Sequence, residues 1–207
     1  MSAFIVKVCG MTRPEDVIGC TEAGADFLGF IFAAKSPRCV TPAQAAALPR
    51  TTAKRVGVFV EQSLPEVLDI MAEAELDLAQ LHGGQDVDFC QAVGPDRVIR
   101  AFWPQKHPSL ASLAAEMTAF EGAVRYALLD AGTSGGGHGT SLDFDALAEL
   151  APPMPWLLAG GLGPDNVAEA IRIAKPNGVD LNSGVESSPG LKDLAKVRRS
   201  LWAVRGV

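Results

Sequence analysis

The chain contains no run of apolar residues that approaches the length of a membrane span, and its basic residues are not gathered into a block. A transmembrane helix needs about 20 consecutive apolar residues, so we exclude a membrane protein. The formal net charge of −6 argues against a nucleic acid as partner. The amino terminus has no basic segment followed by an apolar stretch, so we expect no secretory signal.

Cysteine and histidine are also scarce. The four cysteines show neither a CxxC pattern nor a metal-ligand spacing; they are Cys9, Cys20, Cys39 and Cys90. In a chain of this size, scattered cysteines are typical of free thiols in a reducing compartment. No pair among the three histidines has metal-ligand spacing either. We therefore predict a cytoplasmic protein that binds no metal.

The chain does contain a repeating pattern, in which a short apolar run is followed by an amphipathic helical segment. Hydrophobic residues make up 48% and charged residues 20% of the 207 residues, a balance typical of a globular protein. The pattern predicts strands at 4–12 (the first strand with its end), 26–32, 54–60, 77–81, 97–102, 126–130, 156–159 and 178–181. It predicts helices at 14–23, 41–48, 64–75, 86–93, 109–120, from about 143, 164–174 and 191–203.

Eight strand–helix units in 207 residues predict a fold of the α/β class, a single (β/α)8 TIM barrel that spans residues 1–207. Regular alternation of strands and helices implies a parallel sheet with right-handed crossovers. The alternative is a doubly wound open sheet, which usually has fewer strands. The GxGxxG fingerprint of that fold is missing from the first strand–helix turn, so the barrel is favoured.

The first strand carries an unusual pair of side chains. Because side chains alternate between the two faces of a strand, Lys7 and Cys9 share one face near its carboxyl end. A lysine is seldom buried without a partner, and a cation beside a thiol favours the thiolate. Asp130 ends an apolar strand, where its carboxyl group suits a general acid. The alternatives are a cysteine that only packs and an aspartate that only caps a loop.

In a barrel, functional residues lie where the strands end, and further polar residues and glycines lie at these ends. Arg38, in the loop 33–40, offers a planar guanidinium to a carboxylate, and the alternative is a solvated loop charge. His82 and Arg100 also lie at strand ends. The loops after the last three strands contain glycines whose backbone amides suit a phosphate, the alternative being simple tight turns. The residues of these loops that we expect to bind phosphate are Gly136, Gly137, Gly160, Gly161, Ser183 and Gly184.

Taken in order, these motifs resemble those of the phosphoribosylanthranilate isomerase family, small single-domain barrels of tryptophan biosynthesis. The resemblance runs the length of the chain and rests on KVCGMT at 7–12, SPR at 36–38, QLHG at 80–83, LLD at 128–130, LAGGL at 158–162 and DLNSGVE at 180–186. The chain departs from the family pattern at His138 in the glycine loop, where a small hydroxyl residue is expected. It also departs at Asn182, where a serine is usual.

The resemblance implies an Amadori rearrangement of N-(5-phosphoribosyl)anthranilate to 1-(2-carboxyphenylamino)-1-deoxyribulose 5-phosphate, without a cofactor. It implies that Cys9 is the general base and Asp130 the general acid. It also implies that Arg38 holds the anthranilate carboxylate, that the glycine loops hold the phosphate, and that Lys7 favours the Cys9 thiolate. We expect Lys7 and His82 among the substrate-binding residues. Because no extended apolar interface helix is evident, we expect a monomer.

Three other functions stay open at this point. The related barrel of histidine biosynthesis has a carboxylate where this chain has Cys9, and it consists of two similar halves, a repeat that we do not find here. A phosphosugar epimerase barrel needs metal-binding histidines and aspartates, which this sequence does not assemble. A non-catalytic phosphate-binding barrel keeps the glycine loops but has no need for both Cys9 and Asp130.

Overall fold

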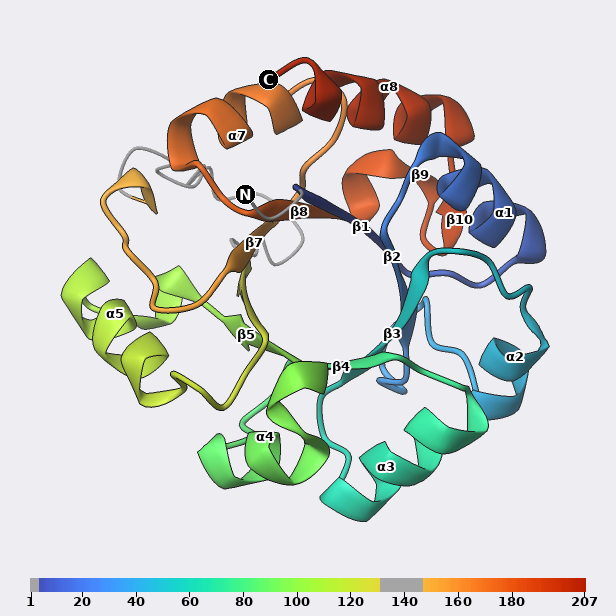
Figure 1. The fold of residues 1–207 in the computed structure, drawn as a ribbon. Coiled ribbons are helices and arrows are strands. Elements are labelled where there is room, and N and C mark those ends of the chain that lie inside the picture. The colour runs from blue at the N-terminus through green and yellow to red at the C-terminus, as the bar shows by residue number, and fades with distance from the viewer. Residues whose placement is uncertain (1–3, 131–146) are drawn as a thin grey trace.

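The computed structural model describes residues 4–130 and 147–207, and its strands close into a parallel barrel (Figure 1). Each strand pairs with the strand before it in the chain, and β8 pairs with β1 to close the ring. The strands of the barrel are β1 (Ile5–Cys9), β2 (Phe27–Ile31), β3 (Lys54–Phe59), β4 (Leu78–Leu81), β5 (Val98–Phe102), β6 (Tyr126–Asp130), β7 (Trp156–Ala159) and β8 (Gly178–Leu181). The (β/α)8 TIM barrel predicted from the sequence is confirmed.

Helices surround the ring of strands (Figure 1). The α-helices are α1 (Pro14–Ala23), α2 (Pro42–Ala47), α3 (Leu64–Glu73), α4 (Val87–Val93), α5 (Leu110–Ala119), α7 (Val167–Ala174) and α8 (Leu194–Arg205). Short 3₁₀ turns are η1 (Pro95–Arg97), η2 (Pro104–Lys106) and η3 (Ser183–Val185). After η3 the chain forms an antiparallel hairpin of β9 (Glu186–Ser188) and β10 (Leu191–Lys192). The helix expected from about residue 143 begins outside the described residues.

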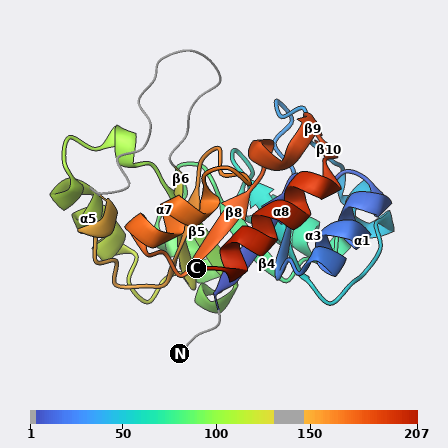
Figure 2. The ribbon, with the colours of Figure 1, turned by 90° about the horizontal axis from the view of Figure 1, so that it is seen from above.

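The last helix begins later than the sequence pattern predicts. We expected a helix at 191–203, whereas Leu191 and Lys192 pair with β9. The Asp193 side chain then caps α8 by accepting hydrogen bonds from the backbone amides of Ala195 and Lys196. The expected start of this helix is therefore wrong, and Figure 2 shows the hairpin that takes its place standing above α8 at one end of the barrel.

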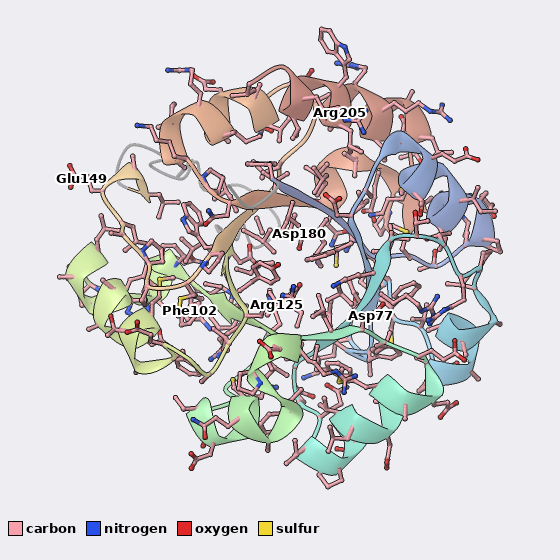
Figure 3. All side chains as sticks on the ribbon, viewed as in Figure 1. Asp77, Phe102, Arg125, Glu149, Asp180 and Arg205 are labelled. Atoms are coloured by element: carbon pink, nitrogen blue, oxygen red, sulfur yellow. The ribbon has the colours of Figure 1, made fainter. Side chains whose placement is uncertain are left out.

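Side chains on the strands divide into an interior layer and an outer layer. Figure 3 shows Asp180 inside the ring of strands and Phe102 between the ring and α5. The larger buried cluster lies between the strands and the helices. Lys7 and Cys9 share one face of β1, as predicted, and Ile5 on the same face belongs to the interior cluster, so this face is the interior one. The apolar interior of the barrel is a separate cluster that includes Ile5, Phe27, Val56, Leu78, Ile99, Ala101, Leu128 and Leu157.

Arg100 belongs to the outer layer. Its guanidinium carbon lies 5.3 Å from the centroid of the Phe120 ring and 5.5 Å from that of Phe102. Its Nη1 donates to the carbonyl oxygen of Ala101 at 2.5 Å. Because the next residue, Ala101, faces the interior, alternation turns Arg100 toward the helices. The structure therefore places Arg100 outside the cavity at the mouth of the barrel.

Candidate active site

A cavity of about 700 Å³ opens at the carboxyl ends of the barrel strands. Barrel enzymes have their active sites at this end, where loops from many strands converge. Seven residues expected from the sequence line it, namely Cys9, Arg38, His82, Asp130, Gly160, Gly161 and Ser183. The structure thus brings together side chains and backbone groups from six strand ends. Gly136, Gly137 and His138 lie outside the described residues.

Sequence reasoning assigned no role to three further residues of the cavity wall, Gln80, Trp103 and Asp180. Gln80 and Asp180 are nearly fully buried polar side chains. The available signal was their position one residue before a strand end, since β4 ends at Leu81 and β8 ends at Leu181. Trp103 follows β5 directly, so it too occupies a strand end.

A buried ion pair supports the floor of the cavity. Lys7 Nζ lies 2.7 Å from Asp180 Oδ2, and the two residues are partners in the register between β1 and β8. Burial alone lowers the pKa of Lys7, but the charges of Asp180 and Cys9 outweigh it, so the pKa is raised and the amine stays charged. Lys7 is fully buried and does not line the cavity. Lys7 therefore lies behind Cys9 and Asp180, both of which line the cavity.

Replacing Lys7 with methionine is expected to lower the free energy of unfolding by about 3–5 kcal/mol, because Asp180 is then buried without its partner. Urea unfolding followed by circular dichroism measures this change. Lys54→Met is the matched control, since Lys54 begins β3 with an exposed side chain. This substitution should lower the free energy of unfolding by less than about 0.5 kcal/mol. A loss below about 1 kcal/mol for Lys7→Met would contradict a stabilising role for the pair.

Cys9 ends β1 with its thiol at the floor of the cavity. Its register partner on β2 is Gly29, where a side-chain Cβ would lie only 2.6 Å from Cys9 Sγ, so the glycine leaves room for the thiol. Burial raises the pKa of the Cys9 thiol above its ordinary value; Lys7 opposes this shift and Asp180 adds to it. Lys7 thus favours the thiolate, as predicted, but burial is the larger effect. The resting group is the thiol.

Asp130 ends β6 and faces His82, which directly follows β4. Asp130 Oδ2 lies 3.2 Å from His82 Nε2. The other ring nitrogen, Nδ1, lies 3.1 Å from the amide nitrogen of Gln80. The Trp103 ring packs edge-on against the imidazole, with centroids 5.2 Å apart. These contacts hold the imidazole between an amide and a carboxyl group, and they place His82 and the Asp130 carboxyl group side by side on the cavity wall.

Arg38, in the loop after β2, is held along one edge by Glu186. Its Nε donates to both carboxylate oxygens at 2.9 and 3.1 Å, and its Nη2 donates to Oε2 at 2.5 Å. These hydrogen bonds raise the pKa of Arg38. Nη1 has no hydrogen bond to any residue that the structure describes. The guanidinium therefore has one edge bound to the protein and one terminal nitrogen available to a ligand.

Two glycine-containing loops meet at the ends of β7 and β8. Gly160 and Gly161 have φ of 115° and 65°, conformations that favour glycine. A Cβ at Gly184 would lie 2.2 Å from the carbonyl oxygen of Leu162, so the backbones of the two loops are in contact. Gly184 stands behind the cavity wall, whereas Ser183 lines it. Backbone amides gathered in such loops suit an anionic group.

The parts of the chain that the structure describes contain neither a cluster of metal-binding side chains nor a helix that could span a membrane. Within 4–130 and 147–207, no three histidine, cysteine, aspartate or glutamate side chains are placed to hold a metal ion. No helix in the same two ranges is long and apolar enough to cross a membrane. All four cysteines are free thiols, as their spacing predicts.

Comparison with known proteins gives a consistent result. A sequence model of the family "N-(5'phosphoribosyl)anthranilate (PRA) isomerase" matches residues 6–202. The N-(5'-phosphoribosyl)anthranilate isomerase of Maridesulfovibrio salexigens is 50% identical over 202 residues, which cover 98% of each chain. The enzyme of the same name from Geobacter sulfurreducens is 43% identical over 207 residues, covering 97% of this chain and 98% of the other.

Solved structures agree with the sequences. The phosphoribosyl anthranilate isomerase of Thermotoga maritima matches with a TM-score of 0.87 and 31% identity, covering 98% of this chain and 99% of its own. A phosphoribosyl anthranilate isomerase in complex with reduced 1-(o-carboxyphenylamino)-1-deoxyribulose 5-phosphate matches with a TM-score of 0.81 and 30% identity, at the same coverage. The fold and the site thus define a (β/α)8-barrel isomerase of the aldose–ketose class. The chain belongs to the phosphoribosylanthranilate isomerase family of tryptophan biosynthesis, and the resemblance seen in its motifs is confirmed.

Proposed function

We propose that the protein converts N-(5-phosphoribosyl)anthranilate, an aminoaldose, to the aminoketose 1-(2-carboxyphenylamino)-1-deoxyribulose 5-phosphate. The observation that supports this best is the presence of Cys9 and Asp130 on the wall of one cavity. Arg38 lines the same cavity, and Glu186 binds only one edge of its guanidinium. The solved relative that carries a reduced form of this ketose is consistent with the same substrate class. The reaction needs no cofactor, because the nitrogen of the substrate takes up and returns the electron pair.

In the proposed mechanism, Asp130 donates a proton to the furanose ring oxygen while the C1–O bond breaks. The nitrogen lone pair forms the C1=N bond of an iminium ion. Cys9, as thiolate, then removes the proton from C2; the C–H electron pair forms a C1=C2 bond, and the iminium pair returns to nitrogen. The resulting enolamine takes up a proton at C1 and loses one from the C2 hydroxyl, which gives the ketone.

Recognition of the substrate is divided among the other residues. Arg38 holds the anthranilate carboxylate with the end of its guanidinium that Glu186 leaves available. The loops that contain Gly160 and Gly161 and those that contain Ser183 and Gly184 bind the phosphate, and Gly136 and Gly137 are proposed to complete this site. His82 contacts the substrate and keeps Asp130 in place. A monomeric state and a cytoplasmic location stay predictions; light scattering tests the first.

The reaction itself is tested by fluorescence. When purified protein is added to freshly prepared phosphoribosylanthranilate, the fluorescence of the anthranilate group should fall with enzyme-dependent kinetics. Heat-denatured protein is the control for spontaneous breakdown of the substrate. A sample in which native protein changes nothing would favour the non-catalytic phosphate-binding barrel, and the larger bis-phosphate substrate of histidine biosynthesis would be tested next.

The pH dependence follows from the raised pKa of Cys9. The reactive form has a thiolate together with a carboxylic acid, yet a carboxyl group ordinarily ionises near pH ~4, well below this thiol. The fraction of the reactive form is then constant between the two pKa values and falls outside them. We expect kcat/KM to be flat from pH 6.5 to about 9 and to fall at higher pH, the alkaline limb belonging to Cys9.

Initial rates across pH 6.5–10 measure this profile. In the Cys9→Asp variant the base is a carboxylate, so any remaining activity should lose the alkaline limb that belongs to the thiol. An alkaline limb below pH 8 in the wild type would contradict the burial of the thiol as the controlling effect.

A further inference from the structure

Lys192, on β10, is a fully buried cation just outside the cavity. Its Nζ donates to Glu186 Oε1 at 2.8 Å and to Asn182 Oδ1 at 3.0 Å, with the Asn182 carbonyl oxygen at 3.4 Å. Its backbone amide donates to Asp16 Oδ2 at 3.2 Å, which anchors the strand to α1. A lysine is rarely buried so completely without a specific role for its charge. It joins the β9/β10 hairpin to the residue that precedes the η3 turn.

Glu186, on β9, lies between two cations. One of its carboxylate oxygens accepts from Lys192 and from the backbone amide of Gly190, and both accept from Arg38. Although burial alone raises its pKa, Arg38 and Lys192 outweigh burial, so the pKa of Glu186 is lowered and the group is ionised. The three charged groups carry a net charge of +1, and the only terminal nitrogen of Arg38 without a partner among the described residues is Nη1.

We propose that Glu186 and Lys192 are positioning residues that present the available end of Arg38 to the substrate carboxylate. This inference rests on the proposed function, since it assigns specificity for the anthranilate carboxylate. A free arginine side chain loses much rotational freedom when it binds a ligand. Glu186 fixes the guanidinium beforehand through its Nε–Nη2 edge, and Lys192 fixes Glu186. The hairpin, whose second strand the sequence pattern assigned to a helix, therefore belongs to the recognition machinery.

The alternative is that Glu186 competes with the substrate carboxylate for the same guanidinium. Geometry argues against competition, because Glu186 uses the Nε–Nη2 edge and leaves Nη1 untouched. Charge argues in the same direction, since Lys192 neutralises Glu186 and preserves the positive charge of Arg38 for a ligand. Positioning and competition predict opposite effects of removing the Glu186 charge, so one substitution separates them.

Two ligands and three variants make the test. The ligands are reduced 1-(o-carboxyphenylamino)-1-deoxyribulose 5-phosphate and its phenylamino analogue without the carboxyl group, and calorimetry gives both affinities. Wild type should prefer the carboxylate ligand by roughly 10- to 100-fold. In Glu186→Gln this ratio should fall below about 3-fold while the analogue binds as in wild type. Glu75→Gln removes a carboxylate from an exposed ion pair with Arg50 and should keep the full ratio.

Lys192→Met is the third variant, because it leaves Glu186 in place but removes its second cation. It should also reduce the ratio. In addition, the affinity for the analogue should fall by about 10-fold, because Asn182, the neighbour of Ser183 in the chain, loses its hydrogen bond from Lys192. An increased ratio in Glu186→Gln would overturn the inference in favour of competition, and an unchanged ratio would overturn it because Glu186 would then not affect recognition of the carboxylate. Equal weakening of both ligands would overturn it in favour of a purely structural role. A wild type that binds neither ligand would instead overturn the proposed function.

Discussion

Replacing Cys9 with serine is expected to lower kcat by at least about 10²-fold, because a serine hydroxyl cannot act as the base that removes the C2 proton. The substitution preserves the shape of the site: serine is no larger than cysteine, and Gly29 opposite leaves space at this position. Binding of the reduced ketose phosphate should therefore stay within about 3-fold of wild type. Stopped-flow fluorescence gives kcat, and calorimetry gives the affinity.

Cys20→Ser provides the matched control for this experiment. Cys20 lies on α1 with a fully buried thiol whose pKa burial raises to about 12, and it does not line the cavity. The control should keep its turnover within about 3-fold. If Cys9→Ser retained more than a tenth of wild-type kcat, another group would have to be the base. If it lost activity and affinity together, the thiol would be needed for binding and not for proton transfer.

Which side chains of β1 share a face was predictable from the sequence, because this depends only on the alternation of side chains along a strand. Lys7 and Cys9 share the interior face once the strand is recognised, and the odd pairing of a cation with a thiol marked that face as functional. The partner of Lys7 was not predictable in the same way. Asp180 lies at the other end of the chain, and only the closure of β8 onto β1 brings it within 2.7 Å.

The balance of effects on the thiol also required the structure. Sequence neighbours identify Lys7 as a cation close to Cys9, and this favours the thiolate. They do not give the degree of burial, which depends on the packing of all eight strands around the position. Burial is the larger effect on the pKa of Cys9, so a rule based on adjacent charge alone predicts the wrong resting state.

The link between Arg38 and the hairpin shows a second limit of prediction from the sequence. The apolar spacing of residues 191–203 fits a helix, and the helix is present from Leu194 onward. What the spacing cannot reveal is that Leu191 and Lys192 pair back on β9, because a two-residue strand has no periodicity of its own. The buried contacts of Lys192 with Glu186 and Asn182 follow from that pairing.

Replacing Asp130 with asparagine is expected to lower kcat by about 10²- to 10⁴-fold, because an amide cannot donate the proton that opens the furanose ring. Asparagine has the same shape as aspartate and can still accept a hydrogen bond from His82 Nε2 if the imidazole presents a proton there. Asp96→Asn is the control, since Asp96 lies exposed in η1 away from the cavity. It should retain wild-type kcat.

An isotope effect separates loss of the acid from a general disturbance of the site. With substrate deuterated at C2, proton removal by Cys9 should contribute to the rate of the wild type and slow it. In Asp130→Asn, ring opening precedes that step and becomes rate-limiting, so the isotope effect on kcat should vanish while kcat falls. A variant whose active site is only distorted would have a lower kcat and would retain the isotope effect. That result would remove Asp130 from the acid role and leave His82, its partner at 3.2 Å, as the group to replace next.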